Sequence, residues 1–419
     1  MQTFFFQTFG CQMNVADSDD LRSLLIERGC SAASGPREAD LLVVNTCSVR
    51  EHAETRALAR IRELSAIKKD TAFLWVTGCM AQRMGDKIIE LIPAVDRVIG
   101  AKEIDNLETI VDSALQMHSL TVPGEQKYGV SDFVSIMRGC DNYCSYCIVP
   151  YVRGHEKSIP VDLLEKAVHR KISRGVKEIT FLGQNVNSYN DNGTDFPDLL
   201  RRVHCIDGLE RIRFTTSHPK DCSEKLISTM ASLPKICRHV HLPVQAGSDR
   251  VLQMMNRRYT SDQYLQKIDM IRRYLPDADI TTDIMVGFPS ETEQEFRDTI
   301  SLVSRACFTN AFMFAYSSRE GTEAASMNDD IPRQEKLSRL NRLIELQTGI
   351  TRKIYENNVG KQLELLITGR QEKRDQLWMG HDKGCKRVLL SCEKAEAGMI
   401  LNVQAAKSSG MTLICERIP

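Results

Sequence analysis

The chain has 419 residues, which is enough for two to four domains of ordinary size and excludes a small disulfide-stapled fold. Hydrophobic residues make up 42% and charged residues 26%, as in globular proteins, which excludes global disorder and a fibrous repeat. The 55 Lys and Arg balance the 55 Asp and Glu, so net charge indicates no particular partner. No apolar run approaches ~18 residues and the N-terminus resembles no secretory signal, so we expect a cytoplasmic protein without a membrane segment.

The first ~120 residues alternate short apolar runs with amphipathic stretches, a pattern typical of β-α units on a parallel sheet. We therefore expect an N-terminal α/β parallel-sheet domain over 1–120. Its expected strands are 3–8, 41–45, 73–77 and 95–99, and its expected helices are 18–28, 51–67, 80–91 and 104–117.

Three cysteines of this domain, Cys11, Cys47 and Cys79, each follow the end of a different expected strand by one to three residues. The carboxyl edge of an α/β sheet is where ligands bind, so three thiols on three loops can converge there. The alternative is that each cysteine packs as a small buried apolar residue.

A segment without periodicity, 121–127, is expected to be a linker to a second domain over 126–358. Six β-α units in about 200 residues predict a partial (β/α)6 barrel whose active face is the carboxyl end of the strands. A charged amphipathic helix over 333–358 ends this domain. The expected strands are 134–137, 178–182, 211–215, 239–242, 280–286 and 310–316.

The last segment, 359–419, has short apolar runs separated by turn residues, which predicts a small five-stranded β-barrel. Residues 361–419 include ten Lys and Arg but only seven Asp and Glu, and this small excess of positive charge is a mild indication of nucleic-acid binding. The expected strands are 363–368, 376–379, 387–390, 399–403 and 412–415.

The strongest motif is a second cysteine triad, Cys140, Cys144 and Cys147, directly after an expected strand. Three thiolates on one loop can hold three corners of a 4Fe-4S cube and leave one iron open for another molecule, as a catalytic cluster requires. A structural zinc would need four ligands. The alternatives are a zinc knuckle completed by His155 and, less in keeping with this density, packing cysteines.

This triad, with Tyr146 before its last cysteine, resembles the signature of the radical S-adenosylmethionine superfamily. The wider stretch 139–154 is similar to one branch of it, the methylthiotransferases. Three stretches around the other triad, 8–14, 45–50 and 77–83, agree with that branch independently. The resemblance covers essentially the whole chain, and its last part resembles the TRAM domain, an RNA-binding module.

The resemblance implies two 4Fe-4S clusters and S-adenosylmethionine. One cluster, at Cys140, Cys144 and Cys147, would bind and cleave S-adenosylmethionine to form a radical, chemistry that only a cofactor supplies. The other, at Cys11, Cys47 and Cys79, would hold a sulfur that is methylated by a second S-adenosylmethionine. Further implied contacts to S-adenosylmethionine are Tyr146, Gly183, Gln184, Asn185, Gln245 and Ser248.

Within the family, residues 12–14 after Cys11 resemble the branch that methylthiolates isopentenylated adenosine at position thirty-seven of tRNA, next to the anticodon. Other branches act on threonylcarbamoyl adenosine of tRNA or on a ribosomal-protein aspartate, and a zinc-stabilised RNA-binding protein without catalysis is the alternative of another class. The expected partners are tRNA, an electron donor such as flavodoxin or ferredoxin and a sulfur source, for a monomeric enzyme. Candidate phosphate contacts in the barrel are Lys361, Arg370, Lys373, Arg374, Lys383, Lys386 and Arg387.

Overall fold

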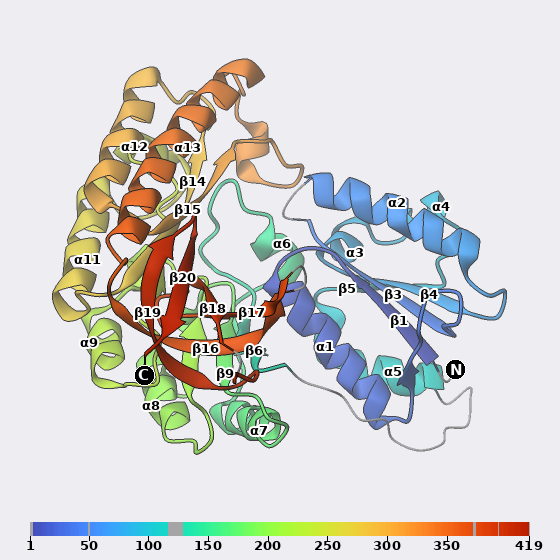
Figure 1. Cartoon of the computed structure of the whole chain (residues 1–419). Coiled ribbons are helices and arrows are strands. Elements are labelled where there is room, and N and C mark those ends of the chain that lie inside the picture. The colour runs from blue at the N-terminus through green and yellow to red at the C-terminus, as the bar shows by residue number, and fades with distance from the viewer. Residues whose placement is uncertain (1–2, 49–50, 116–128, 372–373, 393, 419) are drawn as a thin grey trace. The chain divides into compact units, whose positions relative to one another are not determined.

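The computed structural model describes residues 3–48, 51–115, 129–371, 374–392 and 394–418, and the chain divides into two compact units (Figure 1). The stretch around the second cysteine triad alternates between the units, so Cys140 belongs to the first and Cys144 and Cys147 to the second. The expected three domains stay a prediction, and the expected linker lies outside the described residues. The first unit is Met1–Lys127, Arg138–Asp141 and Ile148–Lys157, and the second is Tyr128–Met137, Asn142–Cys147 and Ser158–Pro419.

The first unit contains the predicted parallel sheet with one further short strand, β2, at its edge, in the strand order β2-β1-β3-β4-β5. Alternate residues of the central strand β3 pack on opposite faces: Leu42 and Val44 lie in one apolar core, and Leu41 and Val43 in the other. Burial on both faces explains the uninterrupted apolar run in the sequence. The strands are β1 (Thr3–Thr8), β2 (Ser31–Ala32), β3 (Leu41–Thr46), β4 (Phe73–Gly78) and β5 (Arg97–Gly100).

The helices of this unit differ from expectation at three places, one of which is the expected helix 104–117, where a 3-10 turn over 103–106 precedes an α-helix that starts at Leu107. Helix α1 (Gln12–Glu27) begins directly after its N-cap Cys11, six residues earlier than expected. The expected helix 80–91 is two helices, α3 (Cys79–Met84) and α4 (Lys87–Leu91), because Gly85 between them has a φ of +54°. The remaining elements of the unit are α2 (Glu51–Ile67), the 3-10 turn η1 (Glu103–Asn106), α5 (Leu107–Leu115) and α6 (Val149–Arg153).

The second unit contains the six predicted parallel strands with helices packed outside them (Figure 1). The partial barrel is confirmed, but its strands form two three-stranded sheets, β12-β9-β6 and β13-β14-β15, rather than one sheet. A single-residue parallel bridge, Ile212 to Ile236, links β12 to the segment before β13. The strands are β6 (Ser131–Ser135), β9 (Glu178–Leu182), β12 (Arg211–Phe214), β13 (His239–His241), β14 (Asp279–Val286) and β15 (Asn310–Ala315).

Most of the helices start at residues that satisfy their free backbone N–H groups. Thr260 and Thr292 form capping boxes at the starts of α11 and α12. The helices are α7 (Val161–Ile172), α8 (Phe196–His204), α9 (Glu224–Ser232), α10 (Asp249–Met254), α11 (Ser261–Tyr274), α12 (Glu293–Ala306) and α13 (Arg333–Glu356), with 3-10 turns η2 (Val186–Ser188), η3 (Pro219–Asp221) and η4 (Glu323–Ser326). The short strands are β7 (Met137–Arg138), β8 (Lys157–Ser158), β10 (Asn190–Asp191) and β11 (Thr194–Asp195).

The C-terminal segment is the predicted five-stranded barrel, closed in the order β16-β17-β18-β20-β19. Its interior is apolar and includes Leu365, Val388 and Val403. The strands are β16 (Gln362–Gln371), β17 (Arg374–His381), β18 (Arg387–Ser391), β19 (Ile400–Ser408) and β20 (Thr412–Arg417).

Buried charges connect this barrel to the amino ends of the parallel strands of the second unit. The Arg211 side chain is completely buried and donates to the carbonyl oxygens of Glu364 and His381, both at 2.8 Å. Lys386 is also buried and pairs with Asp279 at the start of β14. The prediction that Lys386 contacts RNA phosphate is therefore wrong, because its ammonium is used inside the protein. Among the described residues, no helix has both the length and the apolar character needed to cross a membrane.

Candidate functional site

The first triad lies at the carboxyl edge of the N-terminal sheet, as predicted. Cys11 is the N-cap of α1, and Cys79 is the first residue of α3, directly after β4. Cys47 comes directly after β3. Cys47 and Cys79 are buried and Cys11 is exposed, so the triad has one face open to solvent.

The loops that carry these cysteines are in contact with one another. Gly10 has a φ of +120°, and a Cβ there would come within 2.5 Å of the Cβ of Cys47, so the Cys11 loop lies directly against Cys47. Only glycine allows this approach. The Asn14 side chain donates to the carbonyl oxygen of Thr46 at 2.8 Å and accepts from the Cys11 thiol at 3.4 Å. Asn14 therefore ties the Cys11 loop to the Cys47 loop.

The third cysteine is held by a buried arginine that sequence reasoning did not assign a role. Arg153 Nε donates to the Cys79 sulfur at 3.3 Å, and Arg153 Nη2 donates to Asp17 at 2.9 Å. Burial raises the pKa of the Cys79 thiol, while the Arg153 charge acts in the opposite direction. The available signal was an arginine shortly after the second triad, but nothing in the sequence indicated that it packs with residues far earlier in the chain.

These residues fit an iron–sulfur cluster by their chemistry. Thiolates are the usual protein ligands of such clusters, and a neighbouring guanidinium balances thiolate charge. Within the described residues, no three His, Cys, Asp or Glu side chains are already arranged as a metal site. The three thiols instead lie on adjoining loops, with Cys11 and Cys79 turned to the hydrogen-bonding partners given above.

Cys140, the first residue of the second triad, is positioned by the chain that follows the triad. Its backbone N–H donates to the carbonyl oxygen of Gly154 at 3.1 Å. Gly139 has a φ of +78°, and a Cβ there would lie 1.9 Å from the carbonyl oxygen of His155, so no other residue fits. The His155 ring, considered above as a fourth zinc ligand, is exposed and hydrogen-bonded to Asp141 at 2.7 Å.

Cys144 and Cys147 lie in the second unit, where a second buried arginine contacts Cys144. Arg257 Nη1 donates to the Cys144 sulfur at 3.3 Å, and its Nη2 donates to the carbonyl oxygen of Pro243 at 2.8 Å. Tyr146 OH accepts from the same Nη1 at 3.5 Å, and burial raises the pKa of Tyr146 well above its ordinary value. Each triad thus has one cysteine that accepts a hydrogen bond from a buried guanidinium.

The three expected S-adenosylmethionine contacts that follow β9 have different surroundings. Gly183 packs on Met137, since a Cβ would come within 2.6 Å of its Cγ. The Gln184 side-chain oxygen is buried and has no hydrogen-bond partner among the described residues. Both ends of the Asn185 amide are engaged: its oxygen accepts from the His218 backbone N–H at 3.1 Å and its nitrogen donates to Asp221 at 2.7 Å.

The other two expected contacts, Gln245 and Ser248, lie between β13 and α10 and form hydrogen bonds that hold this segment in place. Gln245 has a φ of +74°, and its backbone N–H donates to the carbonyl oxygen of Asp283 at 2.9 Å. Ser248 caps α10 and its hydroxyl donates to Glu295 at 3.1 Å. Direct contact of all these residues with S-adenosylmethionine stays a prediction.

Sequence reasoning missed His218, which follows β12 at the same edge. Its Nδ1 accepts from the backbone N–H of Lys220 at 3.2 Å, so the neutral ring carries its proton on Nε2. That Nε2 is buried and has no partner among the described residues. Burial, with a further contribution from the Arg257 charge, lowers the pKa of His218 to about 2, so the ring is neutral. The run of small and polar residues at 215–218, directly after a strand, was the available signal.

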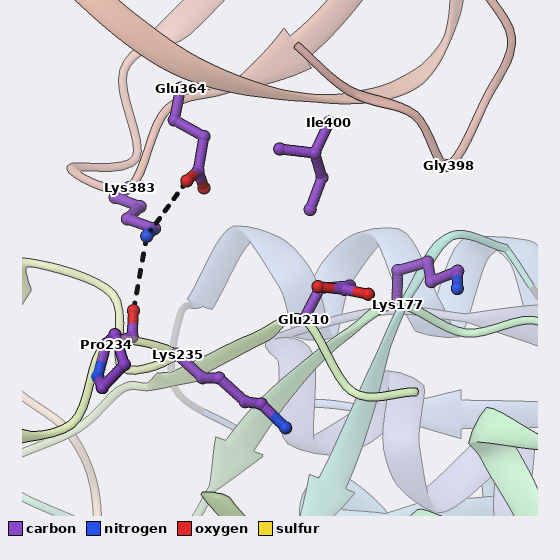
Figure 2. A pocket seen from close by; sticks show the side chains of 8 residues that line it. All are labelled: Lys177, Glu210, Pro234, Lys235, Glu364, Lys383, Gly398 and Ile400. Atoms are coloured by element: carbon purple, nitrogen blue, oxygen red, sulfur yellow. Dashed lines mark hydrogen bonds and ion pairs between the residues drawn. The ribbon is translucent and has the colours of Figure 1, made fainter. Parts of the chain in front are cut away.

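A cavity of about 410 Å³ lies at the opposite, amino ends of these strands, where the barrel docks (Figure 2). Two of its lysines are already engaged: Lys383 with Glu364 at 3.1 Å and the carbonyl oxygen of Pro234 at 3.3 Å, and Lys235 with the carbonyl oxygen of Ile206 at 2.8 Å. The cavity lies between the C-terminal barrel and the parallel strands and is not lined by any cysteine of either triad. Its lining is Lys177, Glu210, Pro234, Lys235, Glu364, Lys383, Gly398 and Ile400.

Comparisons with known proteins cover both units. Residues 134–303 match the radical SAM superfamily, and residues 3–100 match a family described as Uncharacterized protein family UPF0004. Among solved structures, the radical S-adenosylmethionine methyltransferase TsrM from Kitasatospora setae, with cobalamin and a [4Fe-4S] cluster bound, has a TM-score of 0.59 at 13% identity, covering 78% of this chain and 77% of that one. At that identity the likeness concerns the fold.

Curated relatives are similar over nearly the whole chain. The tRNA-2-methylthio-N(6)-dimethylallyladenosine synthase of Caldicellulosiruptor saccharolyticus is 41% identical, over 97% of this chain and 91% of the relative. The protein of the same name from Geobacter metallireducens is 42% identical, over 98% of this chain and 97% of the relative. This chain therefore belongs to the tRNA-2-methylthio-N(6)-dimethylallyladenosine synthase family, a branch of the radical SAM superfamily.

Proposed function

We propose that the protein is a tRNA methylthiotransferase that inserts a methylthio group at carbon 2 of N(6)-isopentenyladenosine next to the anticodon, using two S-adenosylmethionine per product. The observation that carries the proposal is the identity of 41% to 42% with synthases of this name over nearly the entire chain. Such coverage includes the N-terminal sheet, the partial barrel and the C-terminal barrel. This chain and these synthases therefore share all three parts, which supports a common reaction on tRNA.

Cys140, Cys144 and Cys147 would hold a 4Fe-4S cluster with one open iron. When bound, that cluster supplies the electron and the coordination site needed to cleave S-adenosylmethionine. Arg257 stabilises the Cys144 thiolate, and the half-buried Tyr146 ring and the buried Tyr259 ring beside it exclude water. Exclusion of water protects a reactive species from unwanted hydrogen donors. The buried Gln184 oxygen and His218 Nε2 are the acceptor and donor that polar groups of S-adenosylmethionine would satisfy.

Cys11, Cys47 and Cys79 would hold a second cluster, which carries the sulfur to be transferred. Support comes from the contact between the Gly10 and Cys47 segments and from the guanidinium at Cys79. The exposed Cys11 side of the triad is accessible to an incoming sulfur source. The C-terminal barrel would bind the tRNA, an external flavodoxin or ferredoxin would supply electrons, and the enzyme would act as a cytoplasmic monomer.

Variants of single cysteines test this division of roles. Protein reconstituted without air should bind about eight irons if two cubes form. Cys140→Ala should abolish formation of 5'-deoxyadenosine, whereas Cys47→Ala should keep that cleavage and lose methylthiolation of tRNA. Cys205→Ala is the matched control, because this exposed cysteine lies in neither triad, and it should keep both activities.

Mass spectrometry of tRNA nucleosides is the measurement for the product. Wild-type rates of cleavage by Cys140→Ala would refute the radical mechanism. Full methylthiolation by Cys47→Ala would refute the sulfur-carrying role of the first triad. Unmodified isopentenyladenosine together with a methylthiolated ribosomal-protein aspartate would reassign the substrate.

A further inference from the structure

Arg153 is not a cysteine of either triad, yet its side chain contacts the first triad and the residues around it. It lies six residues after Cys147 in the sequence, yet its partners are Asp17 and Cys79 of the N-terminal sheet domain. Only 8% of its surface is exposed. A guanidinium is buried at such a place only when its N–H groups and charge are matched by partners.

The contacts of Arg153 reach all three cysteine loops. Its Nε binds the Cys79 sulfur directly at 3.3 Å. Its Nη2 donates to Asn14 at 3.4 Å, and Asn14 in turn contacts the Cys11 thiol and the carbonyl oxygen before Cys47. One arginine and one asparagine thus connect the three loops through side-chain hydrogen bonds.

Arg153 shares its buried carboxylate partner with a second guanidinium. Its carboxylate partner, Asp17, is 3% exposed and also accepts from Arg138 at 2.5 Å. Arg138 reaches a second carboxylate, Asp20, at 3.5 Å, but Asp20 is exposed. One buried carboxylate therefore lies between two guanidinium groups, one of which touches Cys79. In addition, Arg153 Nη1 is buried without a hydrogen-bond partner among the described residues.

A donor at a ligand sulfur acts on the redox equilibrium of a bound cluster. Reduction adds negative charge, and a fixed positive charge with a hydrogen bond to thiolate favours the more negative state. Groups that hydrogen-bond to the ligands also fix their orientation. The unsatisfied Nη1 is a further donor that a bound anionic group would satisfy.

We propose that Arg153 is a positioning residue of the sulfur-carrying site: its hydrogen bond holds the Cys79 thiolate and raises the reduction potential of the cluster bound by Cys11, Cys47 and Cys79. This inference rests on the proposed function, because it requires that the first triad binds a cluster. It concerns this chain's own arginine, which belongs to neither set of ligands.

The test uses the full chain with Cys140, Cys144 and Cys147 replaced by alanine, so that only the first triad can bind a cluster. Iron content and the reduction potential are measured after reconstitution without air. Arg153→Met should make reduction about tenfold less favourable, which is about 59 mV for one electron. Arg153→Lys keeps the charge without the guanidinium fork and should shift the equilibrium less.

Arg138→Met is the matched control, because it removes a guanidinium from the same Asp17 without removing the contact to Cys79. It should change the reduction equilibrium less than Arg153→Met does. An unchanged potential in iron-replete Arg153→Met would overturn the inference, as would equal shifts in Arg153→Met and Arg138→Met. Loss of iron from both Arg153 variants would also overturn it, because the residue would then serve assembly alone. If the alanine background itself bound no iron, the proposed function of the first triad would be wrong instead.

Discussion

The buried ion pair between Lys386 and Asp279 predicts how firmly the C-terminal barrel is attached to the catalytic strands. Lys386→Met leaves the Asp279 carboxylate, which is 4% exposed, without its cation. Removing one partner of a buried pair costs about 3–5 kcal/mol. Thr309 still donates to Asp279 at 2.8 Å, so we expect the lower end, about 3 kcal/mol.

The same variant should depend on pH in a defined direction. Burial raises the pKa of Asp279, and Lys386 opposes that shift. Without Lys386 the folded protein holds a proton on Asp279 to higher pH than the unfolded chain does. Stability is then gained as pH falls and lost as pH rises through the raised pKa. The cost of Lys386→Met should therefore be smaller at pH 5 than at pH 8.

Urea unfolding measures this cost. The chain has two tryptophans, so in a Trp75→Phe background the fluorescence of Trp378 reports on the barrel. Lys383→Met is the matched control: Lys383 lies on the same loop but its side chain is 32% exposed, and its loss should cost less than about 1 kcal/mol. Equal midpoints for the two lysine variants, or an equal cost at both pH values, would refute the reasoning.

Two further substitutions address the sites directly. Gly10→Ala would place a Cβ 2.5 Å from that of Cys47 at a positive φ, so bound iron should fall from about eight to about four atoms. Gly85→Ala is the control, because Gly85 also has a positive φ but nothing lies near the new Cβ, and this variant should keep all of the bound iron. His218→Gln removes a group whose pKa is lowered to about 2 by burial, so the wild type takes up a proton only on unfolding below about pH 6.5. The free energy of unfolding of the wild type should therefore fall relative to that of the variant by about 1.4 kcal/mol per pH unit below that value. A difference in unfolding free energy that stays constant from pH 7.5 to 5.5, as measured by urea unfolding, would contradict this.

The strands could be predicted from sequence because the apolar runs that form them are buried on both faces, as at Leu41–Thr46. The start of α1 could not, because its first turns bury the polar residues Asn14, Asp17 and Ser18 beside Met13 and Ala16, which breaks the apolar periodicity. A periodicity of apolar residues indicates a helix only where the buried face is apolar. The split between α3 and α4 depends on Gly85, which in sequence alone is compatible with a continuous helix.

The placement of the first cysteine triad could be predicted from the sequence, but the residues that support it could not. Cysteine spacing, together with the placement of strands, put Cys11, Cys47 and Cys79 on loops at one edge. Arg153 and His218 gave no comparable signal, because a sequence does not show which polar side chains are buried or which distant residues they contact.

Asn14 illustrates how the meaning of a motif changes once its contacts are known. In the sequence, residues 12–14 indicate the branch of the family that acts on isopentenylated adenosine. In the structure it joins the Cys11 thiol, the chain before Cys47 and the Arg153 guanidinium. A residue with these contacts is required by the geometry of the cysteine site, whichever substrate is methylthiolated. The substrate assignment therefore depends on the whole-chain similarity to the curated synthases, and the Asn14 contacts are assigned to holding the loops of the first cysteine triad together.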